Sequence, residues 1–363
     1  MSDSRISIFP SNRAVAVARL IFLMAVVLRH SRFTPLDGAE AETLGAELVN
    51  FITVQLTLLG VPGFFFISGG LFFKNLQGNI RAKLKRRVFS LLIPYLIWNC
   101  VGLGIVLLKK YVFAAQFPEF QGVTFSFVNV LKGFWSMDLI GGPTGYPYEG
   151  VMWFVRNLIV VTLVAVPIYR LFGVNKWMLL ALAVALPFIR FFDYGLISSF
   201  FYFYAGGVFF RYADKAKTLP KTAHIGYAAL AGLTAWLIWC FALEFGYAYY
   251  PVECIFMLAG ILGVLCAASL LTSRYETSFA PTSIWLRSAF FVYVVHGFCI
   301  GVPKWCVRTF VQPDAWYVYL LALAAVFLVT WYGCMAVFAV SNRLLPRLTN
   351  ILSGNRAGAA TWR

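Results

Sequence analysis

Residues 50–73 read NFITVQLTLLGVPGFFFISGGLFF, a stretch without a single charged side chain. A helix that crosses a bilayer needs about 20 predominantly apolar residues, so this stretch predicts a transmembrane helix. Other stretches of the same kind bring the predicted total to about ten: 13–30, 88–108, 151–171, 177–190, 196–210, 224–243, 251–271, 285–302 and 316–340. The fifth and sixth in chain order are short, and they fit either two tilted helices or one broken hairpin. The expected fold is an all-α, polytopic helical bundle.

The composition agrees with a protein whose surface mostly meets lipid. Of the 363 residues, 61% are hydrophobic and 12% are charged, whereas soluble proteins average about 25% charged residues. No segment outside the predicted helices is long enough to form a separate catalytic domain. We therefore expect residues 1–363 to form one integral membrane domain, with its core at about 13–340 and any chemistry among the helices.

The formal charge of +16 is distributed as in a membrane protein rather than a nucleic-acid binder. The basic residues fall in short connections between apolar stretches, whereas nucleic-acid binders gather them into soluble patches. With the N-terminus in the cytoplasm, about two thirds of the Lys and Arg residues lie on the cytoplasmic side. This distribution predicts that both termini are cytoplasmic and that nucleic acid is not a partner.

Cysteine and histidine do not form a metal-binding or disulfide pattern. The chain has 7 Cys and 3 His, the cysteines are scattered through apolar stretches, and no Cys-x-x-Cys pair occurs. We expect neither a metal site nor a disulfide framework.

Two ionisable residues occur in the first predicted helix. Arg19 and His30 are eleven residues apart, close to three full turns, so both project from nearly the same helix face. Their separation along the axis is about 16 Å, with Arg19 in the cytoplasmic half and His30 near the outer end. Intramembrane ionisable groups are usually functional. The alternative is an interfacial histidine and an arginine that extends toward the membrane surface.

The connection after residue 73 contains a dense basic cluster that includes Lys85, Arg86 and Arg87, and it has no acidic residue. Such a cluster fixes membrane orientation in many proteins. It also suits the phosphates of a nucleotide-like donor, and anionic lipid headgroups would be attracted as well. Composition alone does not choose among these interpretations.

The longest connection, 109–150, is predicted to face the exterior, and a connection of this length is usually functional or contains its own short helix. Glu149 lies at its end, seven residues before Arg156, and shares a helix face with it if the helix begins that early. Trp153 fits an interfacial aromatic belt. His296, in a later predicted helix, is more often a hydrogen-bonding strut than a catalyst.

Five sequence elements together resemble the acyltransferase-3 family of integral membrane acyltransferases, in the family's order. They are Arg19 with His30; Phe65-Phe66 with Ser68-Gly69 and Leu71; Lys85-Arg86-Arg87 followed by Pro94-Tyr95; Trp153 to Leu158, WFVRNL; and Phe291 to Gly297, FVYVVHG. The similarity extends from about residue 13 to 340. Gly70 stands where the family often has Phe, and Asn157 where Asp is common.

The resemblance implies O-acylation, usually O-acetylation, of a carbohydrate acceptor in the bacterial cytoplasmic (inner) membrane. The co-substrate would be acetyl-CoA or another acyl-CoA, with no tightly bound cofactor. Membrane lipid and the polysaccharide synthesis or export machinery are further expected partners. A glycan or lipid-intermediate transporter is the main alternative, although no second copy of the Arg19–His30 pattern supports an inverted repeat. A non-enzymatic partner of a polysaccharide synthase is a third.

Within this interpretation, each candidate residue has an expected role. His30 would be the general base, or a nucleophile that forms an acyl-histidine, because a site of low dielectric keeps the imidazole neutral. Arg19 would line the donor's path, and Glu149 would orient the imidazole. Lys85, Arg86 and Arg87 would hold the donor phosphates. The expected lining or support of the substrate path consists of Ser68, Trp153, Arg156 and His296.

Overall fold

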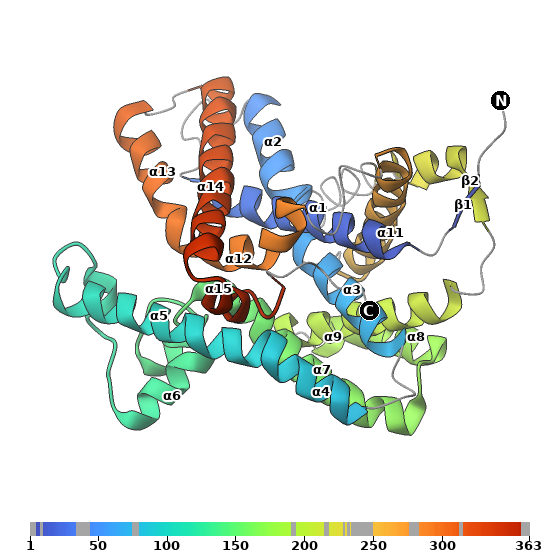
Figure 1. Ribbon diagram of the computed structural model, residues 1–363, viewed down its shortest axis with the longest axis horizontal. Coiled ribbons are helices and arrows are strands. Elements are labelled where there is room, and N and C mark those ends of the chain that lie inside the picture. The colour runs from blue at the N-terminus through green and yellow to red at the C-terminus, as the bar shows by residue number, and fades with distance from the viewer. Residues whose placement is uncertain are drawn as a thin grey trace.

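The computed structural model describes residues 5–7, 10–33, 44–74, 80–189, 194–213, 218–227, 229–230, 233, 250–275, 283–311 and 315–356. These residues are almost entirely helical, which confirms the predicted all-α bundle (Figure 1). The one sheet among them is an antiparallel pair of short strands, β1 (Arg5–Ser7) and β2 (Thr218–Pro220).

The helices of the N-terminal half are α1 (Asn12–Ser31), α2 (Leu44–Asn50), α3 (Gly60–Lys74), α4 (Ile80–Arg87), α5 (Ile93–Tyr111), α6 (Phe127–Trp135) and α7 (Trp153–Phe172). Those of the C-terminal half are α8 (Lys176–Ile189), α9 (Tyr194–Ala213), α11 (Tyr250–Arg274), α12 (Ile284–Cys299), α13 (Gly301–Cys306), α14 (Trp316–Leu344) and α15 (Pro346–Leu352). Short π-helical segments are Phe51–Gln55, Val88–Leu92 and Val307–Val311, and single 3-10 turns are Pro118–Phe120, Met137–Ile140 and Gly150–Met152.

Five helical stretches of the described residues are long and apolar enough to cross a membrane. They are Asn12–Ser31, Ile80–Tyr111, Gly150–Phe172, Met257–Arg274 and Trp316–Leu344. A sixth results if Ile284–Cys299 and Gly301–Val311, bent by 41°, form one broken span. The predicted helix 224–243 lies mostly outside the described residues, so the total of about ten and the orientation of the termini stay predictions.

The predicted span 50–73 is divided into two parts. A helix from Leu44 continues through the π-helical segment to Gln55, a turn follows, and α3 begins at Gly60. Pro62 falls in the first turn of α3, where its missing N–H is not needed. The predicted span 88–108, in contrast, belongs to a longer rod, because α4, the π-helical segment and α5 run on from Ile80 to Tyr111 (Figure 1).

Among the helices that the structure describes, α3 and α9 pack most closely. A Cβ at Gly69 would overlap the carbonyl of Phe203, and a Cβ at Gly206 would overlap the carbonyl of Phe66. Small residues allow two helix backbones to approach this closely. A Cβ at Gly70 would meet the ring of Phe210 in the same interface. Gly69 and Gly70 therefore allow the close packing of the two helices, while the role of Ser68 in the substrate path or its support stays a prediction.

Helix α1 runs through the middle of the molecule and positions both ionisable residues of the first predicted span (Figure 1). It packs against α3, α11, α12 and α14. Ser11 caps its start by accepting a hydrogen bond from the N–H of Ala14 at 3.1 Å. Because α1 is continuous from Asn12 to Ser31, Arg19 and His30 lie on one helix, about 16 Å apart along its axis.

Candidate active site

A cavity of about 750 Å³ opens beside the C-terminal end of α1. Its walls come from α1, α3, α5, α7, α9, α11, α12 and the connection between α5 and α7. The volume falls within the usual range of small-molecule sites, about 300–1,000 Å³. The polar and aromatic groups of its wall include Arg29, His30, Lys109, Thr144, Tyr146, Glu149, Trp153 and Tyr293.

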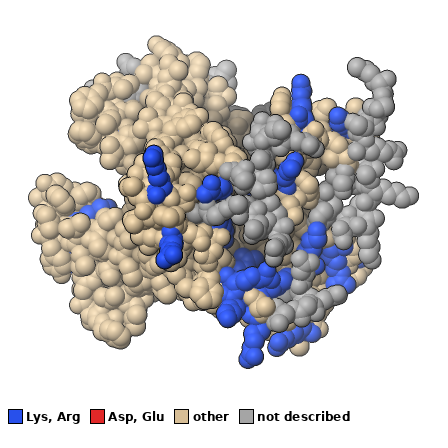
Figure 2. Space-filling model, in the orientation of Figure 1, with Lys and Arg blue, Asp and Glu red and all other residues tan. Residues whose placement is uncertain are grey.

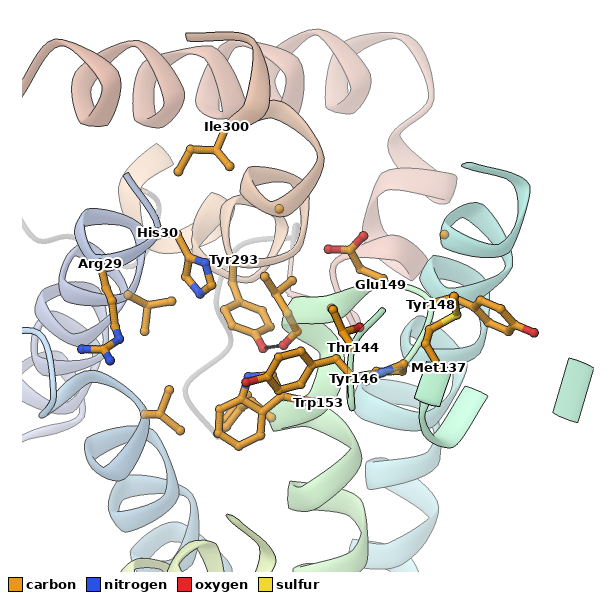
Figure 3. Close-up of a pocket in the computed structure, with 18 of the residues that line it drawn as sticks. Arg29, His30, Met137, Thr144, Tyr146, Tyr148, Glu149, Trp153, Tyr293 and Ile300 are labelled. Atoms are coloured by element: carbon orange, nitrogen blue, oxygen red, sulfur yellow. Dashed lines mark hydrogen bonds between the residues drawn. The ribbon is translucent and has the colours of Figure 1, made fainter. Parts of the chain in front are cut away.

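His30 lies in the last turn of α1, and its exposed side chain lines the cavity (Figure 3). Its imidazole contacts the ring of His296 edge to face, with 5.2 Å between the ring centroids. The charged groups that act on His30 are Lys304 and Arg29, both cationic. The sequence placed His30 in a functional position but did not indicate this pairing with His296.

His296 is fully buried in α12. Its Nδ1 lies 3.2 Å from the carbonyl oxygen of Val292, and because a carbonyl only accepts, Nδ1 carries the proton in that contact. Its Nε2 then has a lone pair and is without a hydrogen-bond partner in the described part of the chain. Unsatisfied buried groups of this kind are rare in folded proteins. Nε2 of His296 is therefore available to a further group, and its interpretation as a hydrogen-bonding strut stays a prediction.

Glu149 is buried at the end of the long connection and lines the cavity. Its N–H donates to Oδ1 of Asn99 at 3.1 Å, and its Oε1 occupies the space that a Cβ at Gly297 would fill. Burial raises the pKa of Glu149 to about 8, although the N–H of Val151 and the charge of Lys109 lower it in part. At neutral pH this shift favours the protonated carboxyl, which is able to donate a hydrogen bond.

Tyr293 is a cavity residue to which the sequence reasoning assigned no role. Its hydroxyl donates to the carbonyl of Val151, and its ring centroid lies 6.1 Å from that of His296. In Figure 3 it lies between His30 and Glu149. No hydrogen bond joins His30 to Glu149 in the structure's described residues, so the expected orientation of the imidazole by Glu149 stays a prediction. The available signal for Tyr293 was its position three residues before His296 in FVYVVHG.

The two candidates at the start of α7 are separated from each other. Trp153 lines the cavity, with its ring centroid 6.4 Å from that of Tyr146. Arg156 instead lies over the ring of Trp135 at 4.6 Å and bonds to the carbonyl of Trp135 and to Oδ1 of Asn157. It lines a second, smaller pocket. Because α7 begins at Trp153, after a 3-10 turn, Glu149 does not share a helix face with Arg156.

The basic candidates lie outside the cavity, with Arg19 in the N-terminal half of α1 and the others on α4. Nη2 of Arg87 donates to the carbonyl of Ser68 at 3.4 Å, and its guanidinium lies 5.7 Å from the centroid of Phe72. Arg19 and Arg87 both act electrostatically on Arg356, near the C-terminus. Lys85 and Arg86 are exposed on α4. The structure thus brings Arg87 and Arg19 together, while Lys85 and Arg86 point outward.

The long connection contains its own short helix, α6, which is one of the two properties expected of a connection of this length. The ring of Tyr148 packs edge to face on Phe134 of α6, at 5.6 Å between centroids. Its hydroxyl donates to the carbonyl of Val130 at 3.2 Å. These contacts hold the end of the connection, and Glu149 with it, against the cavity.

Comparison with known proteins gives one match. A family model described as an acyltransferase domain matches residues 12–339. Neither the curated proteins nor the solved structures contain a match to this chain. The matched region includes the cavity residues, His30, His296 and Arg19. The protein is a multi-pass membrane acyltransferase, and its chain belongs to the acyltransferase-3 family.

Proposed function

We propose that the protein transfers an acyl group, most simply acetyl, from a cytoplasmic acyl-CoA to a hydroxyl of an envelope or exported glycan. The observation that supports this proposal is the position of His30 in the wall of the cavity, about 16 Å along α1 from Arg19, which lies in the N-terminal half of that helix. A base at one end and cations at the other are the arrangement that delivery of an acyl group across a membrane requires.

In the proposed step, neutral His30 takes the proton of the acceptor hydroxyl. The hydroxyl oxygen attacks the thioester carbonyl and forms a tetrahedral intermediate with a negatively charged oxygen. When the intermediate collapses, the C–S bond breaks, the ester remains on the acceptor, and the imidazolium returns its proton to the CoA thiolate. In the covalent variant, His30 attacks the thioester first, the C–S bond breaks, and the CoA thiolate takes the proton that the imidazole loses. The acceptor hydroxyl then attacks the acyl-imidazole, and its proton goes to the imidazole that is released.

Two cavity groups have the chemistry to assist this reaction. The protonated carboxyl of Glu149 is a hydrogen-bond donor at neutral pH, and donors of this kind stabilise a developing oxyanion. The buried Nε2 of His296 adds an acceptor next to His30. We assign Glu149 to oxyanion stabilisation and His296 to positioning of His30.

The acceptor proposal rests on the character of the cavity wall. Tyr146, Tyr148 and Trp153 give it broad aromatic surfaces with a few polar groups between them, a combination typical of sites that orient a small polar ligand. We also propose that the protein lies in the bacterial cytoplasmic membrane with the cavity toward the exterior. The resemblance to the family supports the choice of membrane, and the distribution of basic residues supports the orientation.

The reaction is tested with purified protein in proteoliposomes, radiolabelled acetyl-CoA and a panel of envelope glycans. We expect base-labile label in a glycan, since an O-acetyl ester is cleaved by mild base. A panel of longer acyl-CoA donors determines whether the acyl group is acetyl. If no donor labels any glycan while the proteoliposomes move an intact glycan across the bilayer, the protein is a transporter and the proposal fails.

A further inference from the structure

The segment after α14 folds back against the rod formed by α4 and α5. Nε1 of Trp98 donates to the carbonyl of Leu352 at 3.1 Å. Gly354 follows with φ of 64°, and a Cβ at this position would lie 2.5 Å from the carbonyl oxygen of Ser90. Figure 1 shows α15 lying against α5. The turn therefore requires glycine, and it fixes the direction of the chain toward Arg356.

Arg356 is held on one side only. Its Nη1 donates to the carbonyls of Ser90, at 3.3 Å, and Ser353, at 3.4 Å. Its guanidinium lies 4.5 Å from the centroid of the Phe290 ring. Within the described part of the chain, Nε and Nη2 donate no hydrogen bond. A guanidinium presents five N–H donors in a rigid fork, so the free side of this fork suits a phosphate or carboxylate.

The charged groups whose electrostatic effect reaches Arg356 are cations, as Arg356 itself is. Burial, followed by the charges of Arg19 and Arg87, lowers the pKa of Arg356 to about 9. None of the three pairs with a carboxylate in the residues that the structure describes. Figure 2 shows Lys and Arg side chains gathered on one face of the molecule, without a visible acidic residue. Three partly buried guanidinium groups without an anion repel one another, and a bound anion would remove that cost.

We propose that Arg356, supplied by the segment after α15, joins Arg19 and Arg87 in a binding site for the phosphate groups of the acyl-CoA donor, an inference that rests on the proposed function. Arg19 lies about 16 Å from His30 along α1, so the phosphates would be held at one end of the helix and the thioester would reach toward the other. The family match ends at residue 339, so the segment that supplies Arg356 lies beyond the matched region.

The test measures CoA binding to the full-length protein in phosphatidylcholine nanodiscs by titration calorimetry, without an acceptor. Loss of one charge-assisted hydrogen bond weakens binding by about 10- to 100-fold, so we expect Arg356→Gln to raise the Kd for CoA by that factor. Arg356→Lys should retain part of the affinity. Arg343→Gln, at an exposed position on α14, is the matched control and should bind like the wild type. Pantetheine, which lacks the nucleotide phosphates, should bind both Arg356→Gln and wild type with equal affinity.

A backbone variant gives a second route to the same site. Gly354→Ala should raise the Kd for CoA several-fold, because the turn that places Arg356 cannot accept a Cβ. Gly333→Ala is its control, since no atom lies within 4 Å of a Cβ at that position. Each variant is accepted only if its thermal unfolding in nanodiscs remains cooperative.

Equal affinity of wild type and Arg356→Gln for CoA overturns the inference and leaves the proposed function standing. Failure of the wild type to bind any CoA overturns the donor assignment, and the inference with it. If wild type and Arg356→Gln bind CoA equally in phosphatidylcholine, and phosphatidylglycerol binds the wild type more tightly than Arg356→Gln, the three arginines bind an anionic lipid headgroup and the inference is overturned. Tighter CoA binding by wild type than by Arg356→Gln in both lipids supports the inference.

Discussion

The imidazole rings of His30 and His296 meet edge to face, with 5.2 Å between their centroids, although they come from α1 and α12, far apart in the sequence. His30 lines the cavity, whereas His296 is fully buried behind it with Nε2 unpaired in the described residues. Through this contact, the proposed catalytic histidine in the cavity wall packs against a residue of the buried core. This relationship supports the proposed role of His296 as the residue that positions His30.

His296→Asn should separate positioning from packing. Asparagine can still donate to the Val292 carbonyl, but it removes the ring and Nε2. We expect kcat to fall at least about tenfold, toward the loss typical of a missing acid–base group, with the KM for acyl-CoA unchanged. Steady-state kinetics on protein of verified thermal stability provide the measurement. A purely structural histidine would instead lower the thermal stability and leave the kcat of the folded fraction intact.

Glu149→Gln tests the protonated carboxyl. The folded pKa of about 8 lies above the unfolded value of 4.5, so the native state binds more protons between these values. The free energy of unfolding of the wild type, relative to that of Glu149→Gln, should therefore be highest below pH 4.5 and decrease as the pH rises to about 8. The slope approaches 1.4 kcal/mol per pH unit. Thermal unfolding of both proteins across this pH range gives the difference.

The acyl-transfer activity of Glu149→Gln tests the same assignment. Because glutamine donates a hydrogen bond as the neutral carboxyl does, Glu149→Gln should retain most of the wild-type activity at pH 7. Its activity should also persist above pH 8, where the wild type loses its donor. Loss of activity in Glu149→Gln at pH 7 would show that the carboxylate form is needed, contrary to the assignment of Glu149 as a donor.

Gly69→Ala tests the contact between α3 and α9. The added Cβ would overlap the Phe203 carbonyl, and overpacking of this kind costs about 1–3 kcal/mol. Gly104→Ala on α5 is the control, since a Cβ there meets no atom within 4 Å. Differential scanning fluorimetry in detergent should show a lower Tm for Gly69→Ala and an equal or higher Tm for Gly104→Ala. Equal Tm values for the two variants would contradict the described packing.

Much of the candidate site followed from patterns along single helices. The spacing of Arg19 and His30 fixed their common face, and the length of 109–150 predicted a connection with its own helix. Helical periodicity gives no information on which faces meet in space, which is why the pairing of His296 with His30 was not foreseen. The separation of Glu149 from Arg156 was missed because a 3-10 turn before α7 breaks the assumed periodicity.

Three further features were not predicted from the local sequence. Residues 50–73 are apolar throughout, so hydropathy did not mark the break before Gly60. Helix α4 was read as part of a loop because its charges outweigh its hydropathy, although Arg, Lys, Ala and Leu all favour helix. Arg356 lies in a polar tail without a motif, and only the folded structure places it next to Arg19 and Arg87.

The most direct test of the central claim compares His30→Ala with His224→Ala in acyl transfer from radiolabelled acetyl-CoA, or from the acyl-CoA that the donor panel selects. His224 is a buried histidine on a different element, bonded through Nδ1 to the Pro220 carbonyl, so it controls for the loss of any imidazole. We predict that His30→Ala loses at least about a hundredfold in kcat at wild-type protein level, while the folded fraction of His224→Ala retains its activity. Transfer by His30→Ala at the wild-type rate would contradict the assignment of the cavity as the catalytic centre.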